Sequence, residues 1–383
     1  MWARWLAAVF VGAAFVSVHG YLHAGVDSVT FHRAGNHGGL RPKFFPPSLA
    51  PCTMSNRAAC TLRTTAAVGQ AGNNPGVAVR SAADGKAVAP IPGLGLAPVE
   101  TFFPTADRIV AIGDIHGDEG ALIACLRMSH CIDADSNWCG GTTNVVQIGD
   151  ILDRGDEERG CMDLLFKLKK QAADEGGAVH VLMGNHEVMN VDWDFDYVGL
   201  GGFDGWESRE SLHTPPTSIL GGLLSTFTSG MGFGGAAIPR ILKDRAKAFT
   251  VGTGFAALTL SEMPLAIQIG DTLCVHGGLE LEYIHKGLHR INEESAAWLR
   301  GEASRPNWMG HDDNPIWNRS FSAPADRAVT PSNARKLEQV LHACGARRMI
   351  VGHTPQAGGV NSYVTQLGYE VWCTSIKALL RLY

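Results

Sequence analysis

Short apolar runs alternate with amphipathic segments between residues 108 and 183. The runs at 108–112, 144–148 and 178–183 predict buried strands. Residues 120–128 and 160–170 lie between them, carry apolar side chains mainly on one side, and predict helices. Strands that alternate with helices at this interval are typical of parallel strands joined by crossover helices. The pattern therefore predicts an α/β fold.

Each of these predicted strands ends in a glycine followed by a polar residue. The polar residues are Asp114, Asp150 and Asn185, which are 36 and 35 residues apart. The C-terminal ends of parallel strands meet at one edge of a sheet, where ligands of such folds bind. We therefore expect the three side chains to converge, and the glycines to allow the backbone to turn or approach closely there.

The alternation of predicted strands and helices stops after residue 190 and resumes at residue 272. Residues 191–250 are rich in Gly, Trp, Phe and Thr, contain a helical stretch at 238–249, and predict a cap inserted over the strand ends. Two later apolar runs, 272–275 and 348–351, predict strands that end next to His276 and His353, with a helix at 288–299 between them.

The predicted strand ends collect side chains that can bind metal. The candidate ligands are Asp114, His116, Asp150, Asn185, His276 and His353. A catalytic zinc needs three protein ligands and an open position, so this set suits two ions with one carboxylate between them. Nitrogen and oxygen ligands without sulfur favour Mn, Fe or Zn over Ca or Mg.

Neighbouring side chains fit phosphoester hydrolysis. Two ions about 3.5–4 Å apart generate a bridging hydroxide at neutral pH and hold two phosphate oxygens for in-line displacement. Arg154 offers the planar pair of donors that phosphate favours. We expect His186 to protonate the leaving group and Asp153 to orient that imidazole. Glu187 is interpreted as a supporting hydrogen-bond partner, and Asp118 and Asp156 as helix-start carboxylates.

Five motifs occur in a fixed order along the chain. They are GDIHG, GDILDRG, GNHE, VHGG and GHTP. Together they resemble the metallophosphoesterase superfamily and its phosphoprotein phosphatase family. The longer segments GNHEVMNVDWDFDYV, PIWNRSF and MIVGHTPQAGGVN are similar to the Shewanella-like (bacterial-type) protein phosphatases. This resemblance covers about residues 105–365.

The resemblance implies a β-sandwich flanked by helices, with the cap as an insertion. It assigns Asp114 and His116 to a first metal, Asp150 to the bridge, and Asn185, His276 and His353 to a second metal. It also assigns His186 as general acid, Asp153 as its partner, and Arg154 and Arg319 as phosphate-binding residues. One departure stands near the C-terminus, where EVWCTSIKALLRLY lacks the Asp-x-Gly strand of the family, so we expect the core to lack a strand there.

The implied activity is a dinuclear-metal protein phosphatase that acts on phosphoserine, phosphothreonine or phosphotyrosine. The same metal site also serves small-molecule phosphoesterases such as dinucleoside polyphosphate hydrolases, and the cap decides which ligand enters. A third alternative is an inactive module that binds phosphoproteins. It is disfavoured because the whole set of candidate ligands and the candidate acid is present.

Charge divides the 383-residue chain. Residues 1–99 carry eight Lys or Arg and two acidic residues, a charge of +6, so residues 100–383 carry −11 and the whole chain −5. An acidic body argues against general nucleic-acid binding and suits a protein that binds cations. The nine cysteines contain no C-x-x-C pair, which argues against a metal–thiolate cluster.

The N-terminal part of the chain is predicted to be a targeting sequence. Residues 1–20 combine a basic start with a short apolar stretch and predict a signal peptide. Residues 21–99 are basic and poor in acids, which is typical of a transit peptide or a disordered leader. Together they predict entry into the secretory pathway and import into a secondary plastid, with the ER lumen or secretion as the alternative. Residues 100–383 are predicted to form the catalytic domain, without a membrane span.

Overall fold

The computed structural model describes residues 99–206, 240–322, 330–356 and 359–375, with the backbone alone at residue 241. It also describes the backbone of three strands that form an antiparallel sheet near the N-terminus. These are β1 (Arg4–Val11), β2 (Ala14–Tyr21) and β3 (Ser28–Arg33). The predicted leader at 21–99 lies mostly outside the described residues, and the predicted signal peptide stays a prediction.

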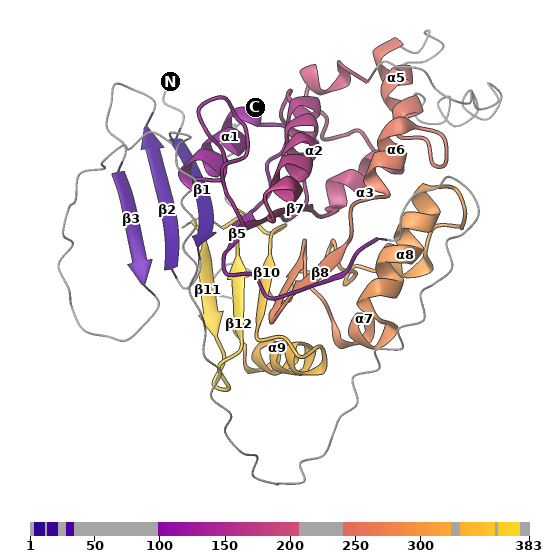
Figure 1. Ribbon diagram of the computed structural model, residues 1–383. Helices are drawn as coiled ribbons and strands as arrows, with labels where there is room; N and C mark the ends of the chain where they lie inside the picture. Colours follow the sequence, from indigo (N-terminus) through magenta and orange to yellow (C-terminus); the bar gives the residue numbers. More distant parts are fainter. Residues whose placement is uncertain are drawn as a thin grey trace. The chain divides into compact units, whose positions relative to one another are not determined.

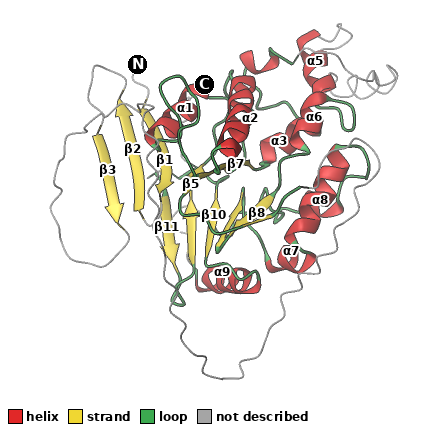
Figure 2. Ribbon diagram, viewed as in Figure 1, coloured by secondary structure: helices red, strands yellow, loops and turns green. Residues whose placement is uncertain are grey.

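The strands from Val99 onward form two sheets (Figure 2). The smaller sheet is parallel and has the order β5 (Ile109–Ile112), β6 (Asn144–Gln147), β7 (Ala178–Val181). The larger sheet is mixed and has the order β11 (Asn361–Val364), β12 (Glu370–Cys373), β10 (Arg348–Val351), β9 (Thr272–Val275), β8 (Ala266–Ile269), β4 (Phe102–Phe103). Strands β9, β10 and β12 run parallel to one another.

An apolar layer joins the two sheets. Its buried members come from alternate positions of the strands of both sheets and from the residues next to them: Ile109, Ala111, Val146, Ile148, Leu182, Ile267, Ile269, Cys274, Ile350 and Trp372. The intervening residues Val110, Val145 and Met349 belong to a second core shared with the helices. Side chains of a strand alternate between its faces, so short all-apolar strands can serve both cores. The predicted β-sandwich flanked by helices is confirmed.

Helices cover the outer faces of the sandwich (Figure 1). They are α1 (Glu119–Met128), α2 (Glu158–Asp174), α3 (Asn185–Val191), α5 (Arg240–Ala248), α6 (Phe255–Leu260), α7 (Leu281–Lys286), α8 (Leu288–Leu299) and α9 (Pro331–Ala343), with 3-10 turns η1 (Gly201–Phe203) and η2 (Asn307–Gly310). Helix α2 packs on β7 and α8 on β8. No helix in the described ranges has the length and apolarity to cross a bilayer.

Two details of the sequence prediction were tested at helix starts. Asp118 caps α1, where its carboxylate accepts the Ala121 N–H at 2.9 Å, as predicted. The prediction that Asp156 starts a helix was wrong, because Glu157 is the N-cap residue of α2. Asp156 instead accepts the N–H of Gly201 at 3.0 Å and so ties the cap to the loop after β6.

The cap and the C-terminal strand are described in part. Residues 191–206 and 240–250 of the predicted cap include η1 and α5, and residues 207–239 lie outside the described residues. The sequence EVWC forms β12, an interior strand between β10 and β11. Thr374 and Ser375 follow this strand at the rim of the sandwich. Residues 376–383 lie outside the described residues, so the expected lack of an Asp-x-Gly strand past VW stays a prediction.

Candidate active site

The polar residues predicted at strand ends lie on one rim of the sandwich. Asp114 follows β5, Asp150 follows β6, and Asn185 follows β7 as the first residue of α3. His276 and His353 follow β9 and β10 in the other sheet. Hydrogen bonds between these residues, given below, cross from one sheet to the other, so the set converges as the strand topology requires.

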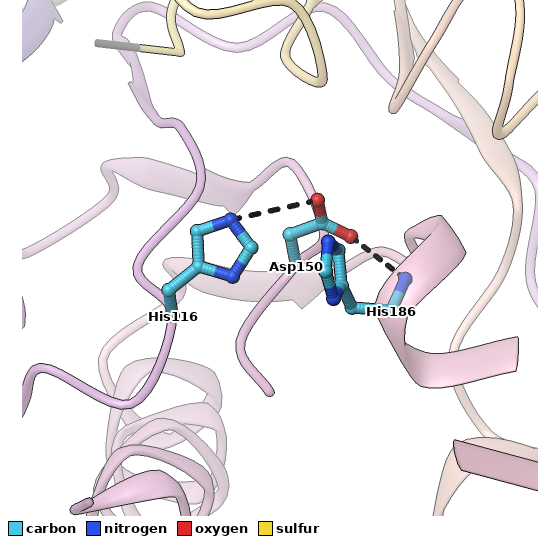
Figure 3. A group of neighbouring side chains, drawn as sticks. All are labelled: His116, Asp150 and His186. Carbon is cyan, nitrogen blue, oxygen red and sulfur yellow. Dashed lines mark hydrogen bonds and ion pairs between the residues drawn. The ribbon is translucent and has the colours of Figure 1, made fainter. Parts of the chain in front are cut away.

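Asp150 is the centre of this set (Figure 3). Its Oδ2 lies 3.2 Å from His276 Nε2 and 3.8 Å from His116 Nε2, and its Oδ1 accepts the backbone N–H of His186 at 3.1 Å. Two buried groups of metal-capable atoms occur among the described residues, one with His116 and His186 and one with His276 and His353. Asp150 belongs to both, which is the position expected of a bridging carboxylate.

The second group also contains an amide oxygen. Asn185 Oδ1 lies 3.0 Å from His276 Nε2 and 2.9 Å from His353 Nδ1. Asn185 and His276 are at most 2% exposed and His353 is 6% exposed. Nitrogen and oxygen donors therefore converge in a desolvated place, and these atom types suit a first-row divalent ion.

The ring nitrogens that face away from the site fix which nitrogens can bind a cation. Nδ1 of His116 lies 2.9 Å from the Leu152 carbonyl oxygen, and Nδ1 of His276 lies 2.8 Å from that of Ile148. A carbonyl only accepts, so each Nδ1 carries a proton, and in the neutral ring each Nε2 has a lone pair directed toward Asp150. These two imidazoles therefore fit a metal site without turning, and a cation bound at Nε2 of His276 would take the place of the proton that Asp150 favours there.

His353 and Arg319 are arranged differently. Arg319 Nε donates to His353 Nε2 at 3.0 Å, so the proton of a neutral His353 ring sits on Nδ1 and is donated to Asn185. Binding an ion through Nδ1 therefore requires that proton to leave and Arg319 to release Nε2. Arg319 thus lies beside a candidate ligand, and its role in binding phosphate stays a prediction.

Asp114 lies at the same rim but outside the two buried groups. Its Oδ1 accepts the backbone N–H of His353 at 3.1 Å, and its Oδ2 accepts the hydroxyl of Ser375 at 2.5 Å. Ser375 was not predicted as a site residue. It follows β12 in the stretch that departs from the family pattern, where the sequence showed only the missing Asp-x-Gly.

The predicted acid and its partner form a close pair. His186 Nδ1 lies 2.5 Å from Asp153 Oδ2, and both side chains are buried. Arg154 Nη2 lies 3.2 Å from Nε2, the other nitrogen of the His186 ring. The half-exposed ring of Tyr197, from the cap, meets His186 edge-on at 5.3 Å and lies 5.9 Å from the Arg154 guanidinium.

The pKa of Asp150 favours an ionised carboxylate at this position, surrounded by imidazole rings. Burial opposes ionisation of Asp150, but His276 and His186 hold its pKa well below the ordinary value. Burial likewise opposes protonation of His276, yet Asp150 raises the pKa of His276 to about 9. Burial and the charge of His276 lower the pKa of His353 to about 3. For His186, Asp150 and Asp153 outweigh burial and raise the pKa, which favours the protonated form of a general acid.

Backbone strain is concentrated in these residues. His116, Asp150, Asp153, Arg154 and His353 all have φ between 50° and 70°. This left-handed region is uncommon for residues with a Cβ and costs of order 1 kcal/mol or more at each position. Five of the ten predicted site residues thus have a strained backbone, which the surrounding contacts hold in place. Backbone strain of this kind clusters at functional sites.

Glycines next to the candidate ligands permit very close approach. A Cβ on Gly184 would lie 2.2 Å from Asp150 Oδ1, and a Cβ on Gly352 would lie 2.5 Å from Asp114 Oδ1. A Cβ on Gly149, which has φ of 94°, would lie 2.7 Å from the Gly184 nitrogen. No other residue type fits these positions without moving a candidate ligand.

Glu187 holds the loop that carries Asp150. Its buried carboxylate accepts the N–H groups of Gly184 at 2.7 Å, Asp150 at 2.9 Å, Ile151 at 2.8 Å and Leu152 at 3.1 Å. Three of these bonds fix the strained turn after β6, and the fourth ties that turn to the residue before α3. This geometry supports the interpretation of Glu187 as a supporting residue.

Known proteins resemble this chain in sequence and fold. A model of the calcineurin-like phosphoesterase family matches residues 107–357. Shewanella-like protein phosphatase 2 of Arabidopsis thaliana is 35% identical over 277 residues, 69% of this chain and 70% of the relative. Shewanella-like protein phosphatase 1 of Plasmodium berghei is 26% identical over 65% and 61%. A solved cold-active protein-tyrosine phosphatase of a psychrophilic Shewanella shares the fold, with a TM-score of 0.53 and 23% identity over 73% of this chain and 74% of that one.

Proposed function

Because the chain belongs to the calcineurin-like phosphoesterase family, we propose that it is a metal-dependent protein phosphatase that hydrolyses phosphomonoesters of serine, threonine or tyrosine. The observation that carries the proposal is the position of Asp150 in both buried groups of candidate ligands, with the His186–Asp153 pair beside it. A shared carboxylate next to a buried acid–base pair suits hydrolysis of a phosphoester.

The proposed cofactor is a pair of divalent ions, with Mn, Fe or Zn favoured by the nitrogen and oxygen donors. Asp114 and His116 would hold the first ion, Asn185, His276 and His353 the second, and Asp150 both. When bound, the ions activate water and bind phosphate oxygens.

The side chains around the ions perform the remaining steps. Arg154 Nη2 lies 3.2 Å from His186 Nε2 in the free protein, so it must turn toward the phosphate before that nitrogen can carry a proton to the leaving group. His186 then protonates the leaving oxygen from Nε2, while Asp153 keeps Nδ1–H in place. Arg319 is proposed as a second phosphate-binding arginine once it leaves His353.

Replacement of His186 tests the role of the acid. We expect His186→Asn in the full-length chain to reduce kcat on an aryl phosphate by roughly 10²–10⁴-fold, because it removes the proton donor. Metal content is expected to stay unchanged, since His186 is not a proposed ligand. An unchanged kcat would refute the assignment.

The substrate class is tested by comparing phosphotyrosine and phosphothreonine peptides with a dinucleoside polyphosphate. The proposal expects the peptides to have the higher kcat/KM, whereas a preference for the dinucleotide would support a small-molecule phosphoesterase. We also propose, from the N-terminal sequence, entry into the secretory pathway and import into a plastid. Fluorescent-protein fusions of residues 1–20 and 1–99 separate these two steps.

A further inference from the structure

A buried arginine from the cap lies behind the acid–base pair. Arg245 is in α5 and its side chain is fully buried. Its Nη1 and Nη2 donate to the two carboxylate oxygens of Glu158 at 2.6 and 3.1 Å. Its Nε and Nη2 donate to Asn190 Oδ1 at 2.9 and 2.7 Å, and Nη1 also donates to the Gly202 carbonyl. All five guanidinium N–H groups thus have acceptors.

Aromatic rings enclose the same guanidinium. Its central carbon lies 5.1 Å from the ring of Trp206, 5.2 Å from Phe249, 5.7 Å from Phe195 and 5.8 Å from Phe203. The rings exclude water and attract the cation through their faces. A charge without solvent is costly unless it is paired, so the arrangement depends on its anionic partners.

Those partners lead directly to Asp153. Glu158 Oε1 accepts the backbone N–H of Asp153 at 2.6 Å, and Asn190 Nδ2 donates to Asp153 Oδ1 at 2.8 Å. Arg245 Nη2 itself lies 3.5 Å from Asp153 Oδ1. Asn190 Nδ2 also donates to the His186 carbonyl at 2.9 Å. One oxygen of Asp153 is thereby fixed from behind, while the other faces His186 Nδ1.

On the basis of the proposed function, we propose that Arg245 is a positioning residue of the reaction: it orients Asp153 toward His186 and ties the cap to this pair. The buried contacts support this role. The side chains of Asp153 and Glu158 are both buried, and Arg245 reaches both of them. The guanidinium and its hydrogen-bond partners therefore hold the Asp153 carboxylate in the orientation that faces His186.

The effect of Arg245 should depend on the leaving group. Proton donation matters more when the departing oxygen is a poor leaving group. We therefore expect Arg245→Met to reduce kcat on phenyl phosphate by roughly 10- to 100-fold through misorientation of the pair. With 2,4-dinitrophenyl phosphate, which departs without help, the loss should be at most about threefold. A smaller fraction of folded protein would lower both rates equally.

Controls separate this role from general damage to the cap. Arg240→Met makes the same change on the same helix at an exposed side chain, and both rates should stay at the wild-type level. If Arg245→Met does not fold, Arg245→Lys keeps the charge but cannot reach both Glu158 and Asn190, so the same dependence on the leaving group is expected.

His186→Asn, measured on both substrates with the full-length chain, distinguishes the two proposals. Dependence on the leaving group in both the His186 and the Arg245 variants supports the positioning role. Dependence in the His186 variant, with equal losses in the Arg245 variants, overturns the role of Arg245 and leaves the proposed acid intact. If neither variant shows it, both the acid assignment and the positioning role fail.

Discussion

Gly184→Ala is a sharp perturbation because it adds one methyl group next to the central carboxylate. The new Cβ would lie 2.2 Å from Asp150 Oδ1, 2.5 Å from the Asp150 nitrogen and 2.9 Å from Glu187 Oε2. The backbone of Gly184 has φ −101° and ψ −175°, which alanine adopts freely. The cost is therefore steric and not conformational. Oδ1 must move by about 1.2 Å to reach 3.4 Å, where ordinary contact begins.

A carboxylate shared by two ions tolerates little displacement. We expect metal affinity to fall by roughly 10- to 100-fold and kcat to fall with it. Overpacking is expected to lower the free energy of unfolding by about 1–3 kcal/mol. Isothermal titration with Mn²⁺, turnover of an aryl phosphate and urea denaturation measure the three effects on one preparation.

Gly310→Ala is the matched control. It makes the same change at an exposed glycine where no atom lies within 4 Å of the added Cβ, so wild-type affinity, turnover and stability are expected. If Gly184→Ala bound metal and turned over substrate as well as the control does, the position of Asp150 would not determine the metal site, and the reasoning would be refuted.

Two further substitutions test Glu187, which holds the loop of Asp150, and Tyr197, which lies beside His186 and Arg154. Glu187→Gln replaces an oxygen that accepts two N–H groups by a nitrogen that cannot, and should lower the free energy of unfolding by about 3 kcal/mol in urea denaturation; an unchanged midpoint would contradict the supporting role. Tyr197→Ala removes a half-exposed ring beside His186 and Arg154, and should raise KM for phosphopeptides several-fold while kcat stays within about twofold. Steady-state kinetics checks this, and a fall in kcat with unchanged KM would place Tyr197 in the chemical step instead.

The strand ends were predictable from the sequence because their signals are local. A short apolar run, a glycine and a polar residue recur at Asp114, Asp150 and Asn185, and parallel strands must bring such ends together. In the second sheet His353 follows an apolar run and a glycine, whereas His276 follows its apolar run directly. The sequence did not show from its residues alone that two sheets share this rim, since all-apolar strands such as β9 do not reveal which face meets which core. That division came from the family resemblance.

The residues behind the site were not predicted because their role arises from long-range contacts. Arg245 lies in a stretch whose Arg and Lys residues resemble a solvated helix face, and its partner Glu158 is 87 residues away. Asn190 occupied a quoted motif but carried no chemical signal of its own. The sequence did show that the cap is rich in Trp and Phe. The structure shows that several of these rings enclose the Arg245 guanidinium.

The central claim is that Asp150 joins two metal ions in one site. Metal stoichiometry and turnover of the full-length Asp150→Asn variant test it most directly, with the wild-type chain beside it. We predict two ions per wild-type chain, and for the variant the loss of at least one ion with a fall in kcat of roughly 10²-fold or more. A variant that retains both ions and full turnover would contradict the account.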